Sequence, residues 1–156
     1  MRIAVISDTH RGKQMIKKAC THTKDVDLLI HLGDNVDDVK EIKKYYNGKI
    51  INVMGNCDFM CDAPMEVVEN IGGKVFLITH GHRYGVKYDL NKLRYRAMEV
   101  KADVALFGHT HESLLINEYG ILFINPGSAS LSRKGPNSLA FIDIEGEEIN
   151  ALIKNI

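Results

Sequence analysis

The stretch "RIAVISDTH", residues 2–10, sets the pattern on which the rest of the chain is built. An apolar run typical of a buried strand leads directly to two polar side chains, Asp8 and His10. Four later strand candidates end in the same way: "LLIHLG" (28–33) before Asp34, "IINVMG" (50–55) before Asn56, "VFLIT" (75–79) before His80, and "VALFG" (104–108) before His109 and His111. Ligands of open α/β sheets bind at the carboxyl ends of strands, so we expect these seven donors to meet at one edge. Gly33, Gly55 and Gly108 are expected to allow tight turns there.

The first part of the chain alternates strand and helix patterns. Residues 13–23 carry apolar side chains on one helical stripe, and a second helix is indicated by Val36, Val39 and Ile42, with Asn35 as its candidate N-cap. Together with strands at 2–7, 27–33 and 49–55, this order predicts a parallel sheet with right-handed crossovers.

The second part is richer in strands. Residues 65–70 and 74–80 flank "IGG" and predict a hairpin, and a helix is expected at about 89–101. Strand patterns follow at 103–108, 113–125 and 137–155, the last two each containing a turn. No linker or repeat divides the chain, so residues 1–156 are expected to form one domain of two packed sheets with helices outside.

The composition narrows the class of protein. Twenty basic residues balance twenty acidic ones, so the chain lacks the positive charge that nonspecific nucleic-acid binding needs. No apolar run is long enough to cross a bilayer, and the first strand is too short for a secretory signal. We therefore expect a cytoplasmic protein with no membrane partner. Its three cysteines, an odd number, are expected to stay reduced.

The seven donors favour a pair of metal ions. They are too many for one tetrahedral ion, whereas two ions sharing a carboxylate, roughly 3.5–4 Å apart, form the usual clamp for phosphoryl chemistry. Imidazole, carboxylate and amide donors without thiolates favour Mn, Fe, Co, Ni or Zn over Ca or Mg.

The ordered motifs "DTH", "GDN", "GNCD", "THGH" and "GHTH" resemble those of the calcineurin-like metallophosphoesterase superfamily, and within it the small YfcE-type phosphodiesterases. The resemblance covers essentially the whole chain. It implies an α/β fold, a four-layer αββα sandwich of two mixed β-sheets flanked by helices. It also implies a dinuclear metal-dependent phosphodiesterase in which a hydroxide between the metals attacks a small phosphodiester. Manganese or nickel is the expected ion, with Fe, Co or Zn as alternatives.

The resemblance also implies roles for individual residues. The first metal would be held by Asp8, His10 and His111, and the second by Asn56, His80 and His109. Asp34 would bridge both ions, and Asn56 would also contact the phosphate.

The chain departs from many members of the family at one position. Those members carry histidine after the asparagine, where it protonates the leaving oxygen or stabilises the transition state, whereas this chain carries Cys57. A thiol is a poorer hydrogen-bond donor than imidazolium, which predicts a preference for leaving groups such as phenolates. Cys57 either acts directly or packs in the interior, and packing is the preferred interpretation. His82 or a metal-bound water is the candidate substitute for the missing group.

Three neighbouring residues have weaker signals. Asp58 is a candidate for orienting a metal ligand, Arg83 is expected to be an ordinary surface arginine, and His31 lies inside a strand, as a core histidine does.

Other functions are compatible with the same fold. A small retromer subunit of this fold serves mainly in protein–protein assembly, but a scaffold has no need to retain all seven donors. Nucleases that process DNA ends carry additional DNA-binding segments and are a less favoured alternative. Two β-rich faces leave room for a homodimer.

Overall fold

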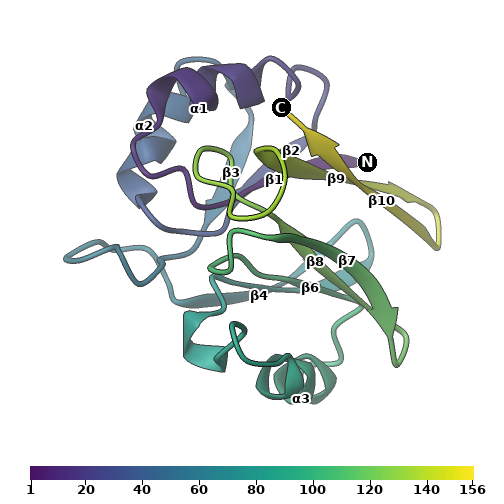
Figure 1. Cartoon of the computed structure of the whole chain (residues 1–156). Coiled ribbons are helices and arrows are strands. Elements are labelled where there is room, and N and C mark those ends of the chain that lie inside the picture. Colours follow the sequence, from purple (N-terminus) through teal and green to yellow (C-terminus); the bar gives the residue numbers. More distant parts are fainter.

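A computed structural model describes residues 1–156, in which two five-stranded sheets pack between helices (Figure 1). The first sheet has the order β10-β9-β1-β2-β3. Its strands are β1 (Arg2–Ile6), β2 (Leu28–His31), β3 (Lys49–Asn52), β9 (Ser138–Glu145) and β10 (Glu148–Asn155). Strands β1, β2 and β3 are parallel, while β9 runs antiparallel to both β1 and β10.

The second sheet has the order β4-β5-β6-β8-β7. Its strands are β4 (Glu66–Ile71), β5 (Lys74–Thr79), β6 (Val104–Leu106), β7 (Ser113–Glu118) and β8 (Ile121–Pro126). Strands β5, β6 and β8 are parallel. The edge strands β4 and β7 run antiparallel to their neighbours, β5 and β8. Both sheets are therefore mixed, and each places parallel strands at its centre.

Helices cover the outer face of each sheet (Figure 1). On the first sheet, α1 (Lys13–Cys20) and α2 (Val39–Ile42) bury Ile16 and Ile42 against Leu29. On the second, α3 (Asn91–Glu99) buries Leu93 against Leu77. The four-layer αββα arrangement inferred from the sequence is confirmed. None of the helices is both long enough and apolar enough to span a membrane.

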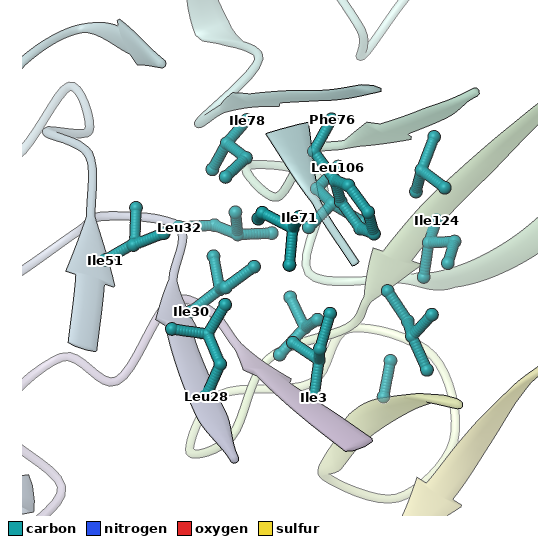
Figure 2. Close-up of a cluster of buried hydrophobic side chains, with 14 of the residues drawn as sticks. Ile3, Leu28, Ile30, Leu32, Ile51, Ile71, Phe76, Ile78, Leu106 and Ile124 are labelled. Carbon is teal, nitrogen blue, oxygen red and sulfur yellow. The ribbon is translucent and has the colours of Figure 1, made fainter. Parts of the chain in front are cut away.

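The main core lies between the two sheets. Figure 2 shows Ile3 and Ile30 of the first sheet facing side chains of the second, among them Phe76 and Leu106. All four are completely buried, and each such side chain contributes about 1.5–3 kcal/mol when it leaves water. This close-packed layer fixes the positions of the strand ends that carry the polar residues.

Several strands end earlier than their apolar patterns predict. The pattern at 49–55 continues past Asn52, where β3 stops, and that at 103–108 continues past Leu106, where β6 stops. Beyond β3, the amide of Val53 still donates to His31, but that of Met54 donates to Pro64, so the chain has left the sheet. The last apolar residues thus form the start of the loops that carry the donors.

The second predicted helix is present in a shorter form, a 3-10 turn η1 (Val36–Asp38) followed by the single turn of α2. The prediction that Asn35 caps it is wrong, because Asn35 has φ 74° and its side chain makes no capping bond. The Val36 amide donates instead to Asp58 Oδ1 at 2.7 Å. A carboxylate from a distant segment therefore performs the capping.

Candidate metal centre

Most of the expected ligands lie on unusual backbone. Positive φ angles occur at Asp8 (54°), His10 (41°), Asp34 (58°), His109 (68°) and His111 (61°). For residues other than glycine this left-handed region is uncommon, and each instance costs of order 1–3 kcal/mol. Strain of this kind persists where the surrounding structure over-determines it and is concentrated at functional sites. Five strained donors converging from three strand ends therefore mark this edge as a site.

Two glycines give the carboxylates room rather than making turns. A Cβ at Gly55 would lie 2.2 Å from Asp34 Oδ1, and one at Gly108 would lie 2.0 Å from Ser7 Oγ. Neither glycine has a positive φ, unlike Gly33 at 94°, so the tight-turn expectation holds only for Gly33. At the other two positions, close approach of neighbouring side chains requires glycine.

Four donors form what we call the first cluster: Asp8, His10, Asp34 and His111. Their ligand atoms all lie within 4.8 Å of one another, an arrangement able to hold a metal ion. His111 Nε2 lies 3.1 Å from Asp8 Oδ1 and 3.2 Å from His10 Nε2. His10 Nε2 also lies 3.8 Å from Asp34 Oδ2. The structure thus brings all three residues predicted for the first metal together with the predicted bridge.

The remaining predicted ligands form a second cluster, Asn56, His80 and His109, on the other side of Asp34. His80 Nε2 lies 3.4 Å from Asp34 Oδ1 and 3.2 Å from Asn56 Oδ1. The centroid of the His109 ring lies 5.1 Å from that of His80. Asp34 directs Oδ1 toward this cluster and Oδ2 toward His10 of the first, which is the orientation a bridging carboxylate needs.

The hydrogen bonds of two histidines indicate what these clusters accept. Nδ1 of His80 lies 2.7 Å from the Leu32 carbonyl, and Nδ1 of His111 lies 2.8 Å from the Leu131 carbonyl. A carbonyl only accepts, so each Nδ1 carries a proton, and the metal-binding form of each ring directs an Nε2 lone pair into the site. There each Nε2 faces a carboxylate or amide oxygen, which is an acceptor too. A metal ion between such acceptors satisfies both, so the residues fit a metal.

The Asp8 carboxylate is the most tightly enclosed donor. Ser7 Oγ donates to Oδ2 at 2.5 Å and the His109 amide donates to it at 3.2 Å, whereas buried Oδ1 has no hydrogen-bond partner. Burial raises the pKa of Asp8, but contact with His111, the His80 charge and the Ser7 hydroxyl outweigh it and the pKa is lowered. The contact with Asp8 in turn raises the pKa of His111.

In the second cluster, the surroundings of His109 favour its neutral form. Burial, followed by the His80 and Lys87 charges, lowers the pKa of His109 to about 4. A neutral imidazole is the form that binds a metal, so His109 needs no deprotonation at neutral pH.

Asp58 organises the loop that carries Asp34. Its Oδ2 accepts the amides of Asp34 at 2.9 Å and Gly55 at 2.8 Å, while Oδ1 accepts that of Val36. The prediction that Asp58 supports a ligand is therefore confirmed in a specific form: it binds the backbone around Asp34. The Cys57 amide adds a bond to Asp34 Oδ1 at 2.9 Å.

A second buried network supports the loop that carries His10. Asp38 Oδ2 accepts Thr9 Oγ1 and the Arg11 amide, each at 2.7 Å. Thr9 Oγ1 also lies 3.0 Å from His31 Nε2. His31 is completely buried, and burial lowers its pKa to about 4, so it is the neutral core histidine that the sequence indicated.

The segment "NPGSAS", residues 125–130, was missed by the sequence analysis. Ser128 Oγ donates to the Asp8 carbonyl at 2.7 Å, and Ser130 Oγ donates to the Thr9 carbonyl at 2.7 Å. Asn125 Nδ2 donates to the Gly108 carbonyl at 3.0 Å. The available signal was the same strand-then-polar pattern at the end of β8. The serine hydroxyls bind backbone carbonyls, however, and the Asn125 amide binds the Gly108 carbonyl and Thr110 Oγ1.

The residues predicted to assist catalysis lie at the open side of the clusters. Cys57 is exposed, so the interpretation that it packs in the interior is wrong. Although the residue is exposed, partial desolvation of its thiol, and then the hydrogen bond with Asp34, raise the pKa of Cys57 to about 11. The His82 ring lies 5.3 Å from that of His80, and its buried Nδ1 has no partner. Arg83 is exposed, as expected of a surface arginine.

Comparison with known sequences agrees with this arrangement. Residues 1–147 match the family described as the calcineurin-like phosphoesterase superfamily domain. The probable metallophosphoesterase YsnB of Bacillus subtilis is 36% identical over 94% of this chain and 86% of its own length. The phosphodiesterase YfcE of Escherichia coli K12 is 33% identical over 67% of this chain and 58% of its own length.

Solved structures show the same fold. An archaeal phosphodiesterase superposes with a TM-score of 0.81 at 27% identity, covering 99% of this chain and 100% of that one. Vps29 of Entamoeba histolytica, in a crystal structure with zinc, superposes with a TM-score of 0.77, covering 99% of each chain. At 20% identity the second likeness concerns the fold alone.

Proposed function

The chain belongs to the calcineurin-like phosphoesterase superfamily, and we propose that it is a dinuclear metal-dependent phosphodiesterase. The observation that carries this proposal is the inward orientation of acceptors: the Nε2 atoms of His80 and His111 face the oxygens of Asp34 and Asp8. Relatives named as phosphodiesterases support the choice of a diester as substrate.

The proposed ligand sets follow the two clusters. Asp8, His10 and His111 hold one ion, and Asn56, His80 and His109 hold the other. Asp34 serves both, since its two oxygens point to different clusters. Imidazole, carboxylate and amide donors favour Mn, Fe, Co, Ni or Zn over Ca or Mg, and among these manganese or nickel is proposed from the resemblance to the small phosphodiesterases.

When bound, two such ions activate water and neutralise charge on the phosphoryl oxygens. The chain contributes orientation: the Leu32 and Leu131 carbonyls fix the tautomers of His80 and His111, and Asp58 fixes the Asp34 loop. Asn56 and His82 lie at the open side and are proposed to contact the substrate phosphate. Cys57 is proposed as a weak donor to the leaving oxygen, which favours leaving groups that need little protonation.

The test is hydrolysis of bis-p-nitrophenyl phosphate beside p-nitrophenyl phosphate. Chelated protein is assayed after return of Mn²⁺, Ni²⁺, Co²⁺, Zn²⁺ or Mg²⁺ one at a time, with ion content measured in parallel. We expect cleavage that returns with a transition metal, reaches its maximum near two ions per chain and favours the diester. Folded protein that binds no ions and cleaves neither ester would contradict the proposal.

The scaffold hypothesis draws only on fold similarity to Vps29. A complete set of inward-facing donors on strained backbone has no purpose in a surface used only for assembly, so we prefer the enzyme.

A further inference from the structure

A cavity of about 470 Å³ lies beside the histidine loop. Three segments that are distant in sequence line it: the residues before α3 (Val86, Lys87, Leu90), the stretch from the loop after β6 into β7 (Phe107, Thr110, Glu112, Ser113, Leu114), and Arg133 from the loop between β8 and β9. The lining therefore contains Thr110, between His109 and His111, and Glu112, which follows His111. The cavity plays no part in the function proposed above.

Hydrogen bonds connect residues that line this cavity with the loop that carries His109 and His111. The Arg133 amide donates to the His111 carbonyl at 3.2 Å. Thr110 Oγ1 accepts Asn125 Nδ2 at 3.0 Å, which holds the loop between the two histidines. A group that binds in the cavity is thus in a fixed position relative to the clusters.

The lining combines apolar walls with cations that lack partners. Val86, Leu90, Phe107 and Leu114 supply apolar surface. Every lysine–carboxylate and arginine–carboxylate ion pair of the molecule involves other residues, so Lys87 and Arg133 have no carboxylate partner. Glu112 also lines the cavity, which leaves two cations against one carboxylate.

We propose that this cavity receives one ester group of the diester substrate, and that Lys87 and Arg133 select an aromatic group that carries a negative charge. The inference rests on the proposed function and specifies its substrate class. Apolar walls accommodate a ring, while the exposed, unpaired cations of the lining favour a carboxylate or phosphate on that ring.

The test uses two matched substrates, 4-nitrophenyl 4-carboxyphenyl phosphate and its 4-carbamoylphenyl counterpart, with the metal-loaded full chain. We expect kcat/KM for the charged ester to be about five- to tenfold higher, as two partly exposed charge contacts provide. Lys87→Gln combined with Arg133→Gln should abolish this preference. Glu112→Gln should increase it, because the opposing charge is removed. Lys18→Gln, an exposed lysine without an ion pair on α1, is the matched control and should leave the preference unchanged.

A second measurement is independent of turnover. Metal-free protein is titrated with 4-hydroxybenzoate and with uncharged 4-hydroxybenzamide, followed by NMR shifts of the Lys87 and Arg133 amides. Tighter binding of the benzoate, lost in the double variant, supports the proposal. Equal kcat/KM for the two esters, or a preference that survives in the double variant, overturns it. If neither ester nor bis-p-nitrophenyl phosphate is cleaved, the proposed function fails, and the titration alone decides whether the cavity binds aromatic anions.

Discussion

The two clusters that share Asp34 are built differently. In the first, Asp8 is completely buried, and the serines of residues 125–130 bind the backbone on which it lies. In the second, Asn56 and Cys57 are exposed, and the loop continues to Phe59, whose exposed fraction is 80%. The Leu32 carbonyl, which binds buried His80, the Asp58 carboxylate and the bond from the His109 amide to Asp8 Oδ2 fix this side from the interior.

This contrast suggests that the two clusters differ in metal affinity and in access to solvent. Donors held by buried hydrogen bonds lose little freedom on binding an ion, so the first cluster should bind its ion more tightly. The second faces solvent, where substrate must enter and product must leave. Occupancy of the second cluster should therefore respond more strongly to metal supply.

The largest effect is expected from Asp34→Asn, which removes the charge common to both clusters. Metal content and diesterase kcat/KM should fall together by more than the roughly 10- to 100-fold typical of outer-shell partners. Elemental analysis after dialysis and bis-p-nitrophenyl phosphate kinetics measure the two quantities. Asp37→Asn is the control, since this side chain is 85% exposed and is not one of the donors. Full metal content and rate in Asp34→Asn would exclude a bridging role.

Variants of Asp38 and Asp58, the two carboxylates that support the ligand loops, should distinguish the clusters. Asp38→Asn disturbs the Thr9 and Arg11 contacts behind His10, and Asp58→Asn disturbs the backbone at Asp34 and Gly55. We expect each to weaken metal affinity by about 10- to 100-fold. The Asp38 variant should affect mainly the tighter ion, whereas the Asp58 variant should weaken both, because Asp34 serves both clusters; two-step calorimetric titrations measure this. Identical titration profiles for the two variants would contradict the distinction.

Ser128→Ala tests how much the buried hydrogen bonds behind the first cluster stabilise the protein. Its hydroxyl donates to the Asp8 carbonyl and accepts the Leu131 amide at 2.8 Å in a completely buried position. Loss of these bonds should lower the free energy of unfolding by about 1–3 kcal/mol, measured by urea denaturation. The exposed hydroxyl of Ser132 bonds only to the Lys134 carbonyl, so Ser132→Ala should cost less than about 0.5 kcal/mol. Equal stability of the two variants would remove the basis for calling the first cluster rigid.

The smallest effect is expected at the exposed side. Cys57→His should raise turnover a few-fold on diesters with poor leaving groups and leave p-nitrophenolate release nearly unchanged, because imidazolium is the better donor. A leaving-group series measures this dependence, and Cys57→Ser is the control for size. An unaltered slope would mean that protonation does not limit the reaction or that His82 supplies the proton.

The strand-then-donor pattern made much of the site predictable. Five buried strands and the polar residues that follow them indicated both the sheet edge and the seven donors, because parallel strands present their carboxyl ends together. The pattern could not place Ser128, Ser130 or Asp38, whose side chains bind backbone from distant segments. It also assigned the wrong reason to Gly55 and Gly108, which make room for Asp34 and Ser7.

The sequence by itself indicated two packed sheets with helices outside and the candidate donors, because strand periodicity is a local property of the chain, and its motif order resembled that of the family. Only the tertiary structure decided which way the lone pairs point, since the tautomers of His80 and His111 depend on the carbonyls of Leu32 and Leu131. It also decided that Lys87 and Arg133 share one cavity beside those histidines. These residues are separated by long stretches of sequence, and packing between the sheets is what brings them together.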